Sequence, residues 1–374
     1  MKHVHLVTGG TGFVGACIIL ELLRQTDVDV FCVVRPGKES VDVRLRNALE
    51  TAARAYALDE TIIDEIKERC YAVPGDVEKD MCGISTSLET PIDQFWHSAA
   101  SLRYENRYAE EITRTNVEGT RHALQLAHHL GVHRFNYVST AYVAGRRSGT
   151  ILEERMDNQE TNNLYEMSKV HAEALVAAAT DLHPRIFRPS IVIGHSKTYA
   201  ATNFTGLYGF MRKLLQFKGM MSRVQEGYLL REALRMRVDA AGLLNFVPVD
   251  MVAQQAVRIG MSSSPASIFH LTNATPPTIE QFLYLLFEEI GIKEPLLVTN
   301  KDDFSWIDSK FDQGLDFYGS YMLGFKVFDR TNTDAALGNT QEGACLLDPP
   351  ELLSYYRWYL ERLAAQRSQL VASR

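Results

Sequence analysis

Short apolar runs alternate with amphipathic stretches through about the first 200 residues of the chain. The runs contain few polar positions, which is typical of strands that are buried on both faces of a sheet. We predict strands at residues 4–8, 28–34, 70–73, 94–98, 134–139 and 185–193. Between them, apolar residues recur at helical spacing, and this pattern predicts helices at 13–25, 41–55, 107–130 and 164–180.

The pattern changes after residue 194. Residues 198–236 are rich in Met, Phe, Tyr and Leu and lack the spacing of a strand, so we interpret them as a helical cap over a pocket, with a plain packing surface as the alternative. Strand-like runs return at 244–249 and 268–272, each followed by a helical pattern. The stretch 348–366 begins with Asp-Pro-Pro, which favours the start of a helix.

A glycine-rich segment, Thr-Gly-Gly-Thr-Gly-Phe-Val-Gly, lies at 8–15 between the first predicted strand and the first predicted helix. Glycines three positions apart permit a tight turn, let backbone N–H groups approach a pyrophosphate, and let the helix pack close to the strand. The start of the helix adds free N–H donors and a positive dipole end. Glycines that serve only the turn are the alternative. The residues expected to bind a dinucleotide here are Thr8, Gly9, Thr11, Gly12, Phe13, Val14 and Gly15.

The order of elements and this loop together predict an α/β fold, a Rossmann-like doubly wound parallel sheet with a smaller, mainly helical C-terminal substrate-binding region. The predicted dinucleotide-binding domain covers residues 1–197 and returns at about 240–275. The predicted substrate-binding cap covers 198–239 and 276–374. A length of 374 residues suits one large domain with a smaller one attached.

A basic segment, Val-Val-Arg-Pro-Gly-Lys, follows the second predicted strand, about twenty residues after the glycine loop. An NAD-preferring site usually carries Asp or Glu here, which accepts a hydrogen bond from the adenosine ribose 2′-hydroxyl. Arg35 instead offers a guanidinium group that suits a 2′-phosphate, and Lys38 or Arg44 could assist it. A solvated basic loop is the alternative. The expected cofactor is NADPH, with NADH as the second choice.

Further cofactor contacts are expected after the third and fourth strands. Asp76 could accept a hydrogen bond from the adenine amino group, with Val77 covering the ring, although an ordinary turn aspartate has the same sequence. The fourth strand ends in small residues, as expected for a chain that passes close under a cofactor, and these are Ser98, Ala99 and Ala100. We interpret His97 as a packed or capping histidine rather than an acid-base group.

Tyr165 and Lys169 form a Tyr-x-x-x-Lys pair on one face of a predicted helix, so both side chains can reach the same ligand. Hydride addition to a carbonyl carbon needs a proton donor at the oxygen, and a tyrosine can donate when its pKa falls from about 10 toward the working pH. A neighbouring ammonium lowers that pKa and can hold the nicotinamide ribose. Thr140, at the end of a predicted strand, offers a hydroxyl group to orient the carbonyl oxygen, with Ser139 as the alternative.

Taken together, the motifs resemble those of the extended short-chain dehydrogenase/reductase family. In family order they are TGGTGFVG at 8–15, GDV at 75–77, HSAA at 97–100, NVEGT at 116–120, VSTAYVAG at 138–145, YEMSK at 165–169 and RPSIVIG at 188–194. Within the family, FCVVRPGKESVDVRLRNAL and RPSIVIGHSKT are similar to the thioester reductase and fatty acyl-CoA reductase branch, whose NAD-binding domain is of the male-sterility type.

The resemblance implies a catalytic triad of Thr140, Tyr165 and Lys169, with Asn116 in support. It also implies that Pro189 and Ser190 lie near the nicotinamide and that residues 198–236 help to form the substrate pocket.

Composition limits the classes of partner. The net charge of −7 argues against a nucleic-acid partner, which needs a basic face, and no apolar run approaches the length of a membrane span. Five scattered cysteines without a CxxC pair give no metal-site spacing, and the first strand begins without a leader-like stretch. These features predict a reduced, cytoplasmic protein. Dimers are frequent in the family that the motifs resemble, so a monomer and a homodimer both remain open.

The expected function is NADPH-dependent transfer of a hydride to the carbonyl of a hydrophobic substrate, in lipid or secondary-metabolite biosynthesis. The expected substrate is an acyl thioester on CoA or on a carrier protein, which would give an aldehyde or an alcohol. A ketone- or quinone-type carbonyl of a small natural product is the alternative. Arg35 in place of an acid argues against a nucleotide-sugar epimerase or dehydratase, and a non-enzymatic NADP(H) sensor has no need of Tyr165 and Lys169.

Overall fold

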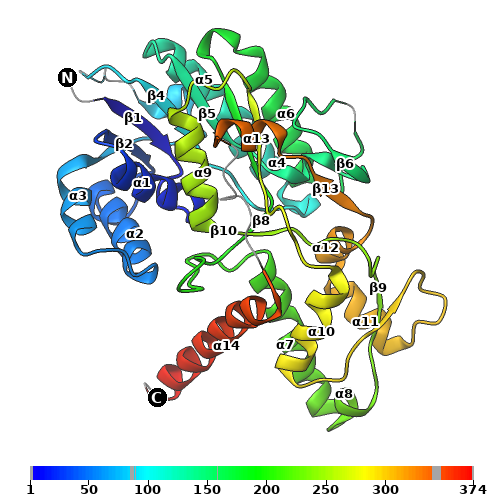
Figure 1. The fold of residues 1–374 in the computed structure, drawn as a ribbon. Coiled ribbons are helices and arrows are strands. Elements are labelled where there is room, and N and C mark those ends of the chain that lie inside the picture. The colour runs from blue at the N-terminus through cyan, green and yellow to red at the C-terminus, as the bar shows by residue number, and fades with distance from the viewer. Residues whose placement is uncertain (1–2, 85–87, 89, 158, 339–346, 373–374) are drawn as a thin grey trace.

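The computed structural model describes residues 3–84, 88, 90–157, 159–338 and 347–372. Its main sheet has seven parallel strands in the order β11-β7-β5-β4-β1-β2-β3 (Figure 1). The strands are β1 (Val4–Thr8), β2 (Asp29–Val34), β3 (Cys70–Pro74), β4 (Gln94–His97), β5 (Arg134–Val138), β7 (Arg185–Pro189) and β11 (Ile268–Leu271). The order runs outward in both directions from the centre, so the predicted doubly wound α/β fold is confirmed.

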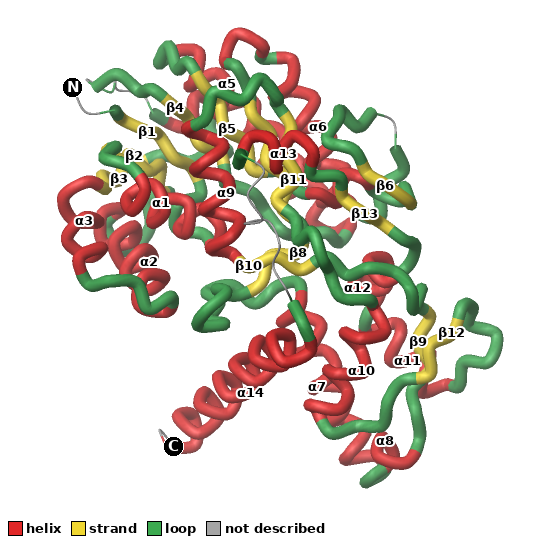
Figure 2. Tube along the Cα trace, viewed as in Figure 1, coloured by secondary structure: helices red, strands yellow, loops and turns green. Residues whose placement is uncertain are grey.

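Helices cover both faces of this sheet (Figure 2). On one face, apolar side chains of α1 (Phe13–Gln25), α2 (Val41–Ala55), α3 (Thr61–Arg69) and α9 (Val249–Met261) form a core with residues such as Trp96 and Phe269. On the other face, α5 (Gly119–His129) and α6 (Leu164–Ala178) pack over residues such as Phe95 and Phe135. Cys17 and Cys32 are buried in the first of these cores.

Residues 185–193 do not form the single strand that their apolar run predicts. The chain leaves the main sheet at Ser190, whose N–H is 3.4 Å from the Leu271 carbonyl, and the next N–H, of Ile191, donates to Asn245 at 3.1 Å. The following strand, β8 (Ile191–Ile193), pairs instead with β10 (Phe246–Pro248). The run changes partner because β11 pairs with its first part and β10 pairs with its last part.

The predicted helix at 107–130 is helical but irregular. It comprises η2 (Asn106–Tyr108), α4 (Ala109–Ile112), a π-helical turn η3 (Thr113–Glu118) and α5. The π turn holds the buried Asn116, whose side chain accepts from the Ser101 N–H at 2.7 Å and donates to the Ser168 hydroxyl at 2.9 Å. Asn116 therefore ties the loop after β4 to the helix that carries Tyr165 and Lys169.

A second core lies beyond the sheet and is built from α7 (Leu207–Val224), α10 (Ile279–Ile290) and α14 (Pro349–Ala372) (Figure 1). Its buried side chains include Leu214, Leu286 and Tyr355. The other helices are η1 (Asp80–Gly83), η4 (Ala141–Ala144), η5 (Thr180–Leu182), α8 (Tyr228–Arg231), α11 (Trp306–Gly314), α12 (Asp316–Gly319), η6 (Ser320–Met322) and α13 (Thr331–Ala336). Two more strand pairs are β6 (Gly149–Ile151) with β13 (Lys326–Phe328), and β9 (Arg235–Arg237) with β12 (Leu296–Val298).

Candidate active site

The glycine loop has the geometry of an anion site. The Gly12 N–H donates to the Gly9 carbonyl at 2.9 Å, and Gly9 itself adopts a φ of +76°. A Cβ at Gly9 would lie 2.6 Å from the Ala99 nitrogen, and one at Gly15 would overlap the Gly9 carbonyl. Gly12 is the N-cap of α1, where no side chain caps the helix and no acidic residue stands in the first turn. This cradle fits the pyrophosphate of a dinucleotide.

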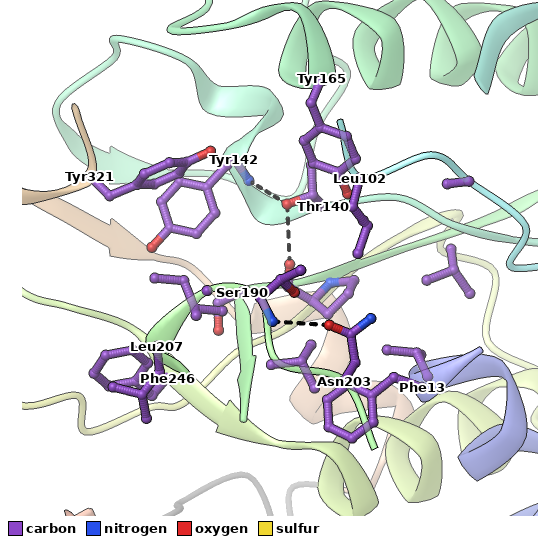
Figure 3. A pocket seen from close by; sticks show the side chains of 18 of the residues that line it. Phe13, Leu102, Thr140, Tyr142, Tyr165, Ser190, Asn203, Leu207, Phe246 and Tyr321 are labelled. Atoms are coloured by element: carbon purple, nitrogen blue, oxygen red, sulfur yellow. Dashed lines mark hydrogen bonds between the residues drawn. The ribbon is translucent and has the colours of Figure 1, made fainter. Parts of the chain in front are cut away.

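A cavity of about 380 Å³ opens beside this loop, a size typical of small-ligand sites. Its lining is mostly apolar (Figure 3). It brings together twelve of the residues singled out in the sequence, namely Gly9, Gly12, Phe13, Val14, Gly15, Ser98, Ala100, Thr140, Tyr165, Lys169, Pro189 and Ser190. They converge because the carboxyl ends of neighbouring parallel strands meet at one edge of the sheet.

The remaining expected cofactor residues do not line this cavity. Thr8 is buried and bonded through its hydroxyl to His97 at 2.7 Å. The others are Thr11, Arg35, Lys38, Arg44, Asp76, Val77 and Ala99. Several of them follow β2 and β3, which continue the same sheet edge away from the cavity.

Arg35 and Lys38 are exposed after β2, and the Arg44 guanidinium donates to the Arg35 carbonyl. Asp76 accepts from the Glu78 N–H at 3.1 Å, as a turn aspartate does. Val77 is buried, and its carbonyl lies 2.8 Å from Nδ1 of His122. The side chain of Val77 packs in the hydrophobic core.

Lys169 is buried in the cavity wall. Its ammonium donates to the Val138 carbonyl at 2.8 Å and to the Tyr137 hydroxyl at 3.2 Å. Burial lowers the pKa of Lys169 to about 7, and the neighbouring Glu173 carboxylate acts in the opposite direction. Glu173 is itself held by Arg188 through two hydrogen bonds of 2.9 and 2.7 Å, and both partners are buried.

Tyr165 projects from α6 into the cavity toward Thr140 (Figure 3). Its pKa is raised by burial and further by the adjacent Glu166 carboxylate, and is not lowered by Lys169 as we expected. The phenol is therefore protonated at neutral pH, which is the form that can donate a proton.

Two hydroxyl groups stand at the end of β5. The Thr140 hydroxyl accepts from the Tyr142 N–H at 3.2 Å and donates to the Pro189 carbonyl at 3.5 Å (Figure 3). The Ser139 hydroxyl is buried in the cavity wall and has no hydrogen-bond partner among the residues that the structure describes. Thr140 and Ser139 both remain candidates for orienting a carbonyl oxygen.

His97 is a packed residue. It is fully buried and lies between the hydroxyl groups of Thr8, at 2.7 Å, and Thr120, at 3.1 Å. Burial and then the Lys169 charge lower the pKa of His97 to about 3, so the imidazole is neutral. The interpretation of His97 as a packed histidine is confirmed.

Most residues of the far wall of the cavity lie outside the motifs singled out in the sequence. Part of it comes from the predicted cap, where Asn203, Thr205, Gly206, Leu207 and Phe210 face the cavity, and this favours the cap over a plain packing surface. The wall also includes Leu102, Tyr104, Tyr142, Leu244, Phe246, Phe282, Tyr318, Tyr321 and Met322. Leu244 and Phe246 lie in a predicted strand-like run, and residues 318–322 lie in the predicted cap 276–374, but no motif marked these residues individually.

We expect the free energy of unfolding of the wild-type protein to rise with pH relative to that of a Lys169→Met variant. Between the folded pKa of about 7 and the ordinary value of 10.5, the unfolded chain holds the proton and the folded chain does not. The wild-type protein therefore gains about 1.4 kcal/mol per pH unit in this window, while the variant does not. Urea unfolding at several pH values measures the free energy of unfolding of both proteins. A difference that is independent of pH would mean that Lys169 keeps its ordinary pKa.

Comparison with known proteins gives consistent matches. A linear gramicidin synthase protein of Brevibacillus parabrevis is 29% identical over 338 residues, which are 85% of this chain and 6% of that protein. Fatty acyl-CoA reductase wat of Drosophila melanogaster is 27% identical over 285 residues, 66% of this chain and 51% of that protein. The chain thus spans a small part of the first relative and about half of the second.

A solved structure extends the match to the fold. The terminal R domain from the myxalamid PKS-NRPS biosynthetic pathway superimposes with a TM-score of 0.74 at 27% identity, covering 97% of this chain and 91% of that one. The sequence pattern of the NAD-binding family described as male sterility protein matches residues 7–256, more than half of the chain. The resemblance inferred from the sequence motifs is confirmed, and the chain belongs to the NAD-binding family described as male sterility protein.

Proposed function

We propose that the protein reduces the carbonyl of a hydrophobic acyl thioester with NADPH, in lipid or secondary-metabolite biosynthesis, and gives an aldehyde or an alcohol. The observation that carries this proposal is the cavity itself. It joins the glycine loop, a protonated phenol at Tyr165 and two hydroxyl groups to a long apolar and aromatic wall. An acyl chain suits that wall because burial of its methylene groups is favourable.

The glycine loop would hold the pyrophosphate, and Pro189 and Ser190 would border the nicotinamide, which supplies a hydride when bound. Thr140, or Ser139 in its place, would hold the carbonyl oxygen by a hydrogen bond. Tyr165 would give its phenolic proton to the oxygen as negative charge develops there. The C–S bond of the resulting hemithioacetal would then break, which releases the thiol of the carrier and leaves an aldehyde, and a second NADPH would be needed to reduce that aldehyde to an alcohol. Lys169, next to Val138 and Tyr137, would stabilise the resulting phenolate.

The test supplies the purified protein with NADPH and a long-chain acyl thioester, and follows nicotinamide absorbance. Consumption of NADPH with formation of aldehyde or alcohol is the expected result. A hydrophobic ketone is assayed in parallel. Turnover of the ketone alone would replace the thioester assignment with that of a carbonyl reductase.

We expect Arg35→Ala to lower kcat/KM for NADPH by about tenfold or more and to leave kcat/KM for NADH nearly unchanged, because a guanidinium–phosphate contact exists only with the 2′-phosphate. Arg35 is exposed after β2, so the change should not affect folding. Arg46→Ala, at an exposed position of α2, is the matched control and should alter neither value. An equal loss with both cofactors would contradict a role at the 2′-phosphate.

A further inference from the structure

A second cavity, of about 740 Å³, adjoins the first. Tyr104 lines both cavities, and Tyr321 lies at their boundary. The Tyr321 ring lines the first cavity and packs edge-on against Tyr142 at 4.7 Å. Its hydroxyl accepts from Nδ2 of Asn163 at 3.2 Å, and Asn163 lines the second cavity. A flexible ligand that extends past Tyr104 could therefore occupy both cavities.

The second cavity is more polar than the first, and its lining holds two carboxylates, Glu105 and Asp312, against a larger number of cations. Four cations line it, and two of them are already paired. Lys301 pairs with Asp312, which also lines the cavity. Arg146 pairs with Glu160 at 3.2 Å.

The side chains of the other two cations, Arg237 and Lys326, form no hydrogen bond or ion pair within the part of the chain that the structure describes, although the backbones of both residues belong to strands. Arg237 ends β9 and is exposed, while Lys326 begins β13 and is half-buried. Burial lowers the pKa of Lys326, although the charge of Glu166 acts in the opposite direction. Glu166 itself accepts hydrogen bonds from the backbone and side chain of Asn162. A half-buried cation without a direct partner has lost hydration that an anionic ligand would replace.

We propose that Arg237 and Lys326 bind the phosphate of the thiol carrier that presents the acyl thioester. The inference rests on the proposed thioester reduction. The acyl group fills the apolar cavity, so the charged end of the carrier must lie outside it, and the basic cavity is its polar neighbour. The ligand is a pantetheine chain ending in a phosphate, and both CoA and a phosphopantetheinylated carrier protein contain it.

The first experiment measures binding and does not depend on turnover. Calorimetry compares 4′-phosphopantetheine with pantetheine, which lacks the phosphate, at saturating NADP⁺ so that the cofactor's own phosphate sites are filled. We expect the phosphorylated compound to bind about tenfold tighter to the wild-type protein, as for one or two charge-assisted hydrogen bonds. The Arg237→Gln/Lys326→Gln variant should lose this difference.

The matched control is Arg223→Gln, since Arg223 is exposed on α7 and lines neither cavity. It should keep the full preference for the phosphorylated compound. Arg237→Gln alone, at an exposed position, keeps the comparison informative if the change at Lys326 affects folding. Equal binding of the two compounds to the wild-type protein, or an unchanged preference in the variants, would overturn the proposal.

The second experiment compares an acyl-phosphopantetheine with the same acyl group on N-acetylcysteamine, which carries no phosphate. The double variant should raise KM about tenfold for the first thioester and leave KM for the second unchanged. If the wild-type protein reduces neither thioester but still prefers 4′-phosphopantetheine through the two cations, the phosphate site stands and the proposed reduction fails. Calorimetry with CoA identifies the source: affinity equal to or above that of 4′-phosphopantetheine assigns CoA, and weaker affinity assigns the carrier-protein arm.

Discussion

Replacement of Tyr165 by Phe should lower kcat for thioester reduction by about a thousandfold, because general acid catalysis contributes on that order. The variant should keep its affinity for NADPH and its unfolding free energy. The Tyr165 hydroxyl has no hydrogen-bond partner within the described ranges of the chain, so its loss breaks no bond that stabilises the fold. Single-turnover reduction and urea unfolding measure the two effects separately.

Tyr71→Phe is the matched control for this prediction. Tyr71 lies far from the cavity lining, is 44% exposed, and donates its hydroxyl hydrogen to the Glu68 carbonyl at 2.8 Å. Its replacement should change kcat by less than about twofold, as for most surface substitutions. If Tyr165→Phe retains more than about a tenth of wild-type kcat, the proton must come from another group or from water.

A Gly15→Ala substitution should lower the free energy of unfolding by about 2–3 kcal/mol and abolish tight binding of NADP(H). The new Cβ would overlap the Gly9 carbonyl oxygen and lie 2.8 Å from the Gly9 carbonyl carbon. Both neighbours are backbone, so no side chain can rotate away. The helix cannot move aside either, because Ile18, Ile19 and Leu22 are fully buried against the core.

Gly314→Ala is the control for the glycine loop, because a Cβ at Gly314 would meet no atom within 4 Å. Its unfolding free energy should stay within about 0.5 kcal/mol of the wild-type value. Urea unfolding gives stability, and quenching of protein fluorescence by NADPH gives affinity. A Gly15→Ala variant with wild-type stability and affinity would mean that the loop relaxes without cost, and the close packing of β1 and α1 would then not explain the glycine.

Much of the sheet was predictable because its elements carry local signals. The predicted bounds of α1 and α2 agree with the structure. In α2, the buried Leu45, Leu49, Ala52 and Ala53 follow helical spacing, and Ser40 caps the helix by accepting from the Val43 N–H. In α1, a continuous apolar run indicates a helix that is buried on all sides. The position of the site at one edge of the sheet was equally predictable, because parallel strands bring their carboxyl ends together.

Features that depend on distant partners left no such signal. The run 185–193 reads as one strand, and its division at Ser190 depends on Asn245, which follows 55 residues later. In the π turn at Thr113–Glu118, backbone hydrogen bonds join residues five apart, whereas in an α-helix they join residues four apart. The spacing of apolar side chains does not reveal this difference. Tyr318 and Tyr321 reach the cavity from a segment of short helices without periodic pattern, so only tertiary packing places them.

The position of β11 has a consequence for how the chain acquires its structure during synthesis. This strand, from Ile268 to Leu271, pairs with β7 along its whole length and shields the buried Ile186 and Phe187. Until the ribosome has released some 270 residues, β7 therefore presents an unpaired apolar edge. A fragment that stops near residue 197 contains every predicted catalytic residue and the complete glycine loop, yet it should aggregate through that edge rather than fold.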